Sequence, residues 1–276
     1  MRKTLETIAA MWVLISGVVL AGTLAIMRQS LVLAQGPTPT PTPGPNDRFG
    51  LHNVCSWMIR DSYYNQGRVD PEGDMDTRYQ YARDADVGWT RWVFEWSRVE
   101  RQEGAYDFSS MDPVVERDIA NGLHTLAILK NTPHWAQNSA CKGDEGCPPV
   151  LYTDTAKTKP IAVFLDSEGN PTDIIAQAHG INPANSWAMF VNKIVEHYKP
   201  AGVLAEQHPE WPESAGIRHW EIWNEPDLEW RGEAKEFYCL LQVACLTIHY
   251  TDPQAQVLLP AFADGGNCPF ADLLIR

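Results

Sequence analysis

The sequence lacks several features that mark other classes of protein. Its 22 lysines and arginines are outnumbered by 35 aspartates and glutamates, and a formal charge of −13 does not suit a nucleic-acid-binding protein. Neither a His-Glu-x-x-His motif nor paired Cys-x-x-Cys motifs occur, so a catalytic zinc site is not expected. Phosphate-loop, dinucleotide-binding and Gly-x-Ser-x-Gly patterns are also absent. We therefore expect no metal site and no cofactor.

Charge is also missing from one long stretch near the N-terminus. The uncharged run 7–27 follows two basic residues and is about as long as a membrane-spanning helix requires. Small residues at 32 and 34 would also suit a signal-peptidase site, so a cleaved signal peptide and an uncleaved anchor both remain open for residues 1–35. Either would export the rest of the chain. Residues 36–46 form a Pro/Thr-rich linker, and the folded domain is expected at 47–276.

After the linker, strand and helix patterns alternate. We predict strands at 49–54, 90–96, 124–129, 217–223 and 256–261, and helices at 77–87, 111–121, 185–198 and 233–249. This alternation predicts right-handed βαβ units and a parallel sheet. One connection is much longer than the others, and we interpret 137–184 as an insertion containing a small β-hairpin near 161–170.

The fourth predicted strand runs into the sequence Trp-Asn-Glu-Pro at 223–226. A period of two would place Glu221 and Glu225 on the same face. Pro226 cannot donate to a sheet ladder and favours extended backbone at Glu225, so we expect the strand to end there. Glu221 would lie about 13 Å deeper than Glu225. We expect it to form a buried ion pair with an arginine such as Arg91.

The stretch 223–226 resembles the acid/base strand of the clan-A glycoside hydrolases, which are (β/α)8 barrels. The second predicted strand is similar to the clan pattern in which Arg91 is followed by Trp96. The segment 100–112 resembles the stretch that joins strand two to helix two in families 5 and 39, and 132–136 resembles the end of strand three. The resemblance covers 49–276 without the insertion, and it is slightly nearer to family 39 than to family 5.

The resemblance implies an α/β fold, the (β/α)8 TIM barrel, of which this chain would hold about five βα units. It implies a retaining glycosidase in which Glu225 is the general acid/base and Asn224 bonds the sugar 2-hydroxyl. The family nucleophile, a glutamate on strand seven, would follow residue 276. Glu95 and Asp264 are weaker candidates for that role. We therefore expect this chain by itself to be inactive and poorly soluble, because five strands cannot close the barrel.

Other residues at predicted strand ends are candidates for sugar contact. The candidate substrate-binding residues are Asn224, Arg91, His134, Trp96, Trp135, Trp223 and His52. Packing in the core is an equal alternative for each tryptophan. A carbohydrate is the expected partner, since an acidic, tryptophan-rich chain suits a neutral ligand. A non-catalytic carbohydrate-binding protein on a degenerate barrel, and a chance motif in an unrelated α/β barrel, remain alternatives. The sequence does not indicate an oligomeric state.

The six cysteines suit disulfides in an exported chain. Cys141 and Cys147 flank a short loop and are the predicted pair. Cys239 and Cys245 fall on one predicted helix, where six residues of separation point them apart. We therefore do not expect a bond between them.

Overall fold

The computed structural model describes residues 49–52, 54, 72–141, 143–144 and 146–263. All of them lie in a compact unit that extends from Pro45 to Arg276. The predicted signal or anchor at 1–35, the linker at 36–46 and Asp264 lie outside the described residues. Among the helices that the structure describes, none is long and apolar enough to cross a membrane.

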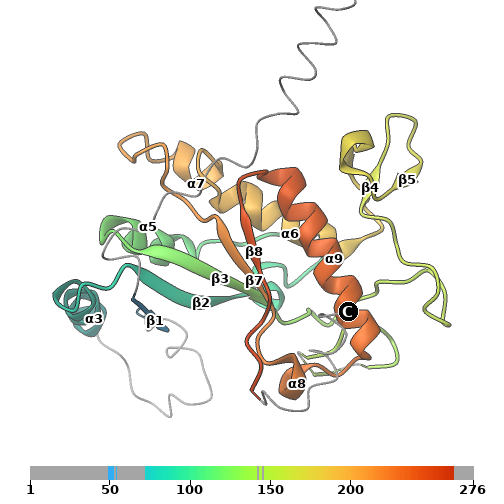
Figure 1. The fold of residues 1–276 in the computed structure, drawn as a ribbon, viewed down its shortest axis with the longest axis horizontal. Coiled ribbons are helices and arrows are strands. Elements are labelled where there is room, and N and C mark those ends of the chain that lie inside the picture. The colour runs from blue at the N-terminus through green and yellow to red at the C-terminus, as the bar shows by residue number, and fades with distance from the viewer. Residues whose placement is uncertain (1–48, 53, 55–71, 142, 145, 264–276) are drawn as a thin grey trace, which may run out of the picture. The chain divides into compact units, whose positions relative to one another are not determined.

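A parallel sheet of five strands organises the described part of the chain (Figure 1). The strands are β1 (Gly50–His52), β2 (Trp89–Glu95), β3 (His124–Lys130), β7 (His219–Ile222) and β8 (Gln256–Leu258), in that order across the sheet. Every neighbouring pair is parallel. The predicted alternation of strands and helices is therefore confirmed, and the sheet is consistent with part of a (β/α)8 barrel.

Helices connect the strands. They are α3 (Glu72–Asp84), α4 (Trp96–Val99), α5 (Asp112–Ala120), α6 (Ser186–Tyr198), α7 (Val203–Glu206), α8 (Pro226–Glu229) and α9 (Ala234–Thr251). Helix α9 starts with a reciprocal capping box between Glu233 and Glu236, and Asn185 caps α6 by accepting a bond from the Ala188 amide at 3.1 Å. In contrast, α5 begins at a proline-containing turn without a side-chain cap. Figure 1 shows α5, α6 and α9 on one side of the sheet and α8 beyond the ends of β7 and β8.

Alternating residues of the central strands pack against the helices. Trp92 and Phe94 are fully buried, and their rings stack at 4.0 Å. Phe94 also contacts the ring of Tyr198 on α6 at 5.3 Å. Helices α6 and α9 are joined by the Trp187 indole, which donates to the Leu240 carbonyl at 3.1 Å. Because this apolar layer takes one set of alternating positions, the other set is left for polar groups.

Asp118 of α5 is a buried carboxylate between helix and sheet. It accepts hydrogen bonds from the Tyr79 hydroxyl at 2.7 Å, the Trp92 indole at 3.0 Å and the Thr125 hydroxyl at 2.9 Å. These donors come from α3, β2 and β3, so one side chain ties three elements to α5. Burial without an opposite charge raises its pKa from 3.8 to about 6, and the three hydrogen bonds only partly offset this.

The predicted insertion contains the expected hairpin. Strand β4 (Phe164–Leu165) pairs with β5 (Pro171–Thr172) and also with β6 (Gly180–Ile181), in an antiparallel sheet of three strands. A 3-10 turn, η2 (Ile175–Gln177), lies between β5 and β6. The predicted bond between Cys141 and Cys147 is present, and Cys239 and Cys245 are not disulfide-bonded.

Candidate active site

The chain turns sharply after β7. The strand ends at Ile222, and Trp223 and Glu225 both have positive φ, at 70° and 43°. The prediction that strand geometry continues to Glu225 was therefore wrong. The Glu225 amide donates to the Ala261 carbonyl at 2.9 Å, beyond the end of β8, while the Glu225 carbonyl accepts from the Leu228 and Glu229 amides at 2.9 Å. These hydrogen bonds, to the segment after β8 and to the first turn of α8, hold the Glu225 backbone in a left-handed conformation. They do so although a following proline favours extended backbone.

A buried ion pair lies below this turn, as predicted. The Arg91 guanidinium donates to both carboxylate oxygens of Glu221, each at 2.7 Å, and the Glu221 side chain is only 5% exposed. The same guanidinium donates to the Asn224 amide oxygen at 2.9 Å. One Glu221 oxygen also accepts from the Ala261 amide at 3.1 Å. Arg91 therefore connects the sheet interior with the residue that precedes Glu225, and it orients the Asn224 amide by taking up its oxygen.

His52 extends this cluster to the end of β1. Its Nδ1 lies 3.2 Å from the Arg91 guanidinium. Desolvation and the Arg91 charge lower the pKa of His52, whereas the charges of Glu221 and Glu225 act weakly in the opposite direction. The side chains of His52 and Asn224 thus meet at the Arg91 guanidinium. His52 ends β1 and Asn224 follows β7, whereas Arg91 is the third residue of β2.

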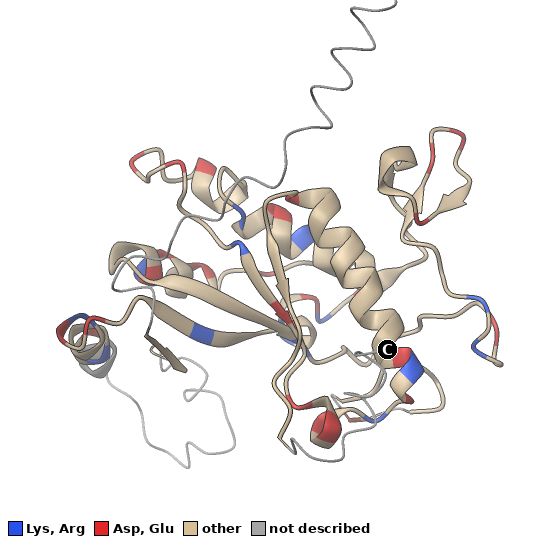
Figure 2. Cartoon of the chain, in the orientation of Figure 1, with Lys and Arg blue, Asp and Glu red and all other residues tan. Residues whose placement is uncertain are grey.

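Carboxylates dominate the surface beside the turn. Helix α8 carries Asp227 and Glu229 within four residues and is coloured largely as acidic in Figure 2. The Asp227 carboxylate accepts from the Ala263 amide at 3.1 Å, which adds a second link to the segment after β8. Glu229 pairs with Lys130 at the end of β3. Neither contact of α8 was predicted, although the lysine that follows the apolar run 126–129 in β3 was a visible signal.

Two of the candidate tryptophans belong to the core. Trp96 is fully buried, stacks on Phe190 at 5.2 Å and donates to the buried Glu100 carboxylate at 2.6 Å. Trp223 is also fully buried and packs edge-on against Trp230 at 4.9 Å. The packing alternative therefore holds for both, because neither offers a free ring face to a sugar.

His134 and Trp135 lie in the loop after β3. His134 is exposed. Trp135 is partly buried, and its indole donates to the Glu100 carbonyl at 2.9 Å, which fixes its ring. Both remain available for sugar contact. Glu95, the weaker nucleophile candidate, is 9% exposed and pairs with Arg98, so its carboxylate is already engaged.

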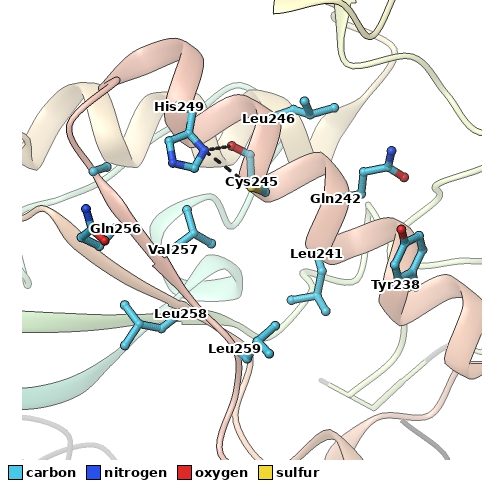
Figure 3. A pocket seen from close by; sticks show the side chains of 11 residues that line it. Tyr238, Leu241, Gln242, Cys245, Leu246, His249, Gln256, Val257, Leu258 and Leu259 are labelled. Carbon is cyan, nitrogen blue, oxygen red and sulfur yellow. Dashed lines mark hydrogen bonds between the residues drawn. The ribbon is translucent and has the colours of Figure 1, made fainter. Parts of the chain in front are cut away.

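An apolar groove of about 550 Å³ lies elsewhere, between α9 and β8 (Figure 3). Its lining includes Tyr238, Leu241 and Leu246 of α9 and Val257 and Leu259 of the β8 segment. None of the predicted site residues lines it.

Neither a protein-family model nor a curated protein sequence matches the chain. Solved structures of glycoside hydrolases are similar to it at low identity. A family 39 glycoside hydrolase from Bacteroides cellulosilyticus shares 17% identity, with 70% of this chain and 30% of that chain covered and a TM-score of 0.38. An exo-β-1,4-mannosidase from an Opitutaceae bacterium shares 14% identity, with 76% of this chain and 31% of that chain covered and a TM-score of 0.43. An endoglucanase from Pseudomonas stutzeri shares 14% identity, with 70% of this chain and 49% of that chain covered and a TM-score of 0.40. The chain spans about a third to a half of the length of these structures.

Proposed function

We propose that this chain is part of an exported, retaining glycoside hydrolase in which Glu225 is the general acid/base. The observation that carries the proposal is the Arg91 guanidinium, which bonds both Glu221 and Asn224 and so holds the Asn224–Glu225 pair at the carboxyl edge of the sheet. In parallel α/β sheets, this edge is where catalytic groups gather.

The proposal assigns different roles to the two neighbouring side chains. With its oxygen bound to Arg91, the Asn224 amide would present its N–H groups outward to a sugar hydroxyl. Glu225 is partly exposed, so its carboxyl can reach a glycosidic oxygen and transfer a proton to the departing sugar. Glu221 is too deeply buried and too fully bonded to take part.

A retaining mechanism also needs a carboxylate nucleophile about 5–5.5 Å from the acid/base. Glu95 and Glu221 are both engaged in ion pairs. We therefore assign the nucleophile to a residue outside the described part of the chain, and the substrate to an oligosaccharide or polysaccharide.

The decisive test is Glu225→Gln, measured in the protein together with any sequence that follows residue 276 in its gene. Loss of the proton donor should lower kcat by several orders of magnitude for glycosides with poor leaving groups. Activated aryl glycosides need little protonation and should lose much less. Glu213→Gln, in an exposed loop, is the matched control and should behave as wild type. Equal loss with both substrate types would contradict the role, and sugar binding without any hydrolysis would favour the carbohydrate-binding alternative.

A further inference from the structure

The disulfide-closed loop of the insertion lies directly against the segment that follows Glu225. Within this loop, Cys141 and Cys147 are bonded, and the described residues between them are Gly143, Asp144 and Gly146. Its neighbour is the segment from α8 to Arg231. The contacts between the two are both polar and steric.

Arg231 makes the polar contacts. Its backbone amide donates to the Gly146 carbonyl at 3.0 Å, and its guanidinium donates to Asp144 at 3.1 Å and to the Leu228 carbonyl at 3.3 Å. Asp144 also accepts from the Gly146 amide at 2.8 Å, and this bond together with Arg231 lowers the pKa of Asp144. Both side chains of the Arg231–Asp144 ion pair are 53% exposed, so the pair by itself contributes little to the stability of this contact.

The stronger constraint is the backbone approach at Gly146. A Cβ at this position would lie 2.0 Å from the carbonyl oxygen of Glu229, the last residue of α8. The loop can therefore touch α8 only because residue 146 has no side chain. A larger residue would have to displace one backbone from the other, since no flexible side chain lies between them.

The loop is also anchored to the central sheet through Gln137, which is only 3% exposed. The Gln137 amide donates to the Thr132 carbonyl after β3 and to the Asp144 carbonyl, each at 3.0 Å, and accepts from the Gly143 amide at 3.1 Å. At the same end of α8, Lys130 pairs with the Glu229 side chain. The disulfide loop thus connects the end of β3 to the far end of α8, whose first turn is formed on the Glu225 carbonyl.

We propose that the Cys141–Cys147 loop positions the acid/base residue by clamping α8 at Gly146. This inference rests on the proposed function for its catalytic meaning, but the clamp itself can be tested without activity. Gly146 and Asp144 are positioning residues, because they act on Glu225 only through α8.

The test is Gly146→Ala, with Gly180→Ala as the matched control. Gly180 lies in the same insertion, and a Cβ there would meet nothing within 4 Å. Hydrogen exchange of the peptide that covers 225–231 should become roughly tenfold faster in Gly146→Ala, with β2 and β3 unchanged. In an active protein, kcat for glycosides with poor leaving groups should fall about 10–100-fold, with little change for activated ones. Should Gly146→Ala fail to fold, Cys141→Ser/Cys147→Ser provides the same two measurements.

The outcomes are distinguishable. Exchange in Gly146→Ala that equals that of Gly180→Ala would overturn the clamp. Equal loss with both leaving-group types would reduce the loop to general structural support and so overturn its positioning role. Faster exchange in a protein that cleaves no glycoside would support the clamp and count only against the acid/base assignment.

Discussion

Replacing Asp118 by asparagine should stabilise the protein above neutral pH. An asparagine can keep two of the three hydrogen bonds of the buried carboxylate and can reverse the third. Its oxygen can accept from the Trp92 indole and the Thr125 hydroxyl, as one carboxylate oxygen does now. Its amide can donate to the Tyr79 hydroxyl oxygen, which now donates to the other carboxylate oxygen. The substitution therefore removes the buried charge, but the Tyr79 hydroxyl hydrogen loses Asp118 as its acceptor and the second amide N–H gains none in this cluster. These losses make the full electrostatic gain an upper limit.

The size of the effect follows from the pKa. Folding raises the pKa of Asp118 from 3.8 to about 6, so the native state binds the proton more tightly than the unfolded state. Stability is therefore highest below the unfolded pKa and is lost as pH rises through about 6. A shift of roughly two pKa units corresponds to about 3 kcal/mol. Asp118→Asn should thus be near neutral at pH 4 and stabilising by up to this amount at pH 8.

Urea unfolding of both proteins between pH 4 and pH 8 measures this difference. Asp76→Asn is the control, since it makes the same chemical change on a side chain that is 80% exposed. A difference between Asp118→Asn and wild type that stays constant across the pH range would refute the reasoning. It would mean that Asp118 has the same proton affinity in the folded and unfolded states.

Two further predictions concern the ion pair and the sheet edge. Arg91→Met should destabilise the protein by about 3 kcal/mol in thermal or urea unfolding, because it leaves the buried Glu221 carboxylate without its partner. Adding Glu221→Leu should restore most of that stability but not activity, because Asn224 still lacks its donor; restored activity would contradict the orienting role of Arg91. Leu259→Lys should raise solubility, measured by light scattering, and change stability by less than about 0.5 kcal/mol, because Leu259 is 60% exposed beside the apolar groove. Unchanged solubility would show that this edge does not drive association.

Most strands and helices of the fold were predictable from the sequence, but the exact residues at which some of them begin or end were not. Strands β2, β3 and β8 begin within one residue of the predicted positions, because apolar runs bounded by polar residues and glycine mark buried strands. The helix predicted to begin at residue 111 begins at Asp112, with Met111 as its cap residue, while the nearby Ser109 bonds Asp107. The residue at which a helix begins depends on which of several local hydrogen bonds forms, and a sequence pattern does not show which of them is the most stable.

Within the site, the ion pair was predictable and the turn was not. A carboxylate on a strand buried on both faces needs an opposite charge, so burial predicted that Glu221 pairs with an arginine such as Arg91, and Arg91 is its partner. The left-handed backbone of Glu225 did not follow, because it depends on a hydrogen bond to Ala261 that is 36 residues distant.

The sequence by itself determined the alternation of strands and helices, the placing of Asn224 and Glu225 after a central strand, and the Cys141–Cys147 bond. All three depend on local spacing and on the chemistry of single residues. Only the tertiary structure decided that Trp96 and Trp223 are core residues and that Gly146 touches α8, because burial and close approach depend on which distant segments share the same space.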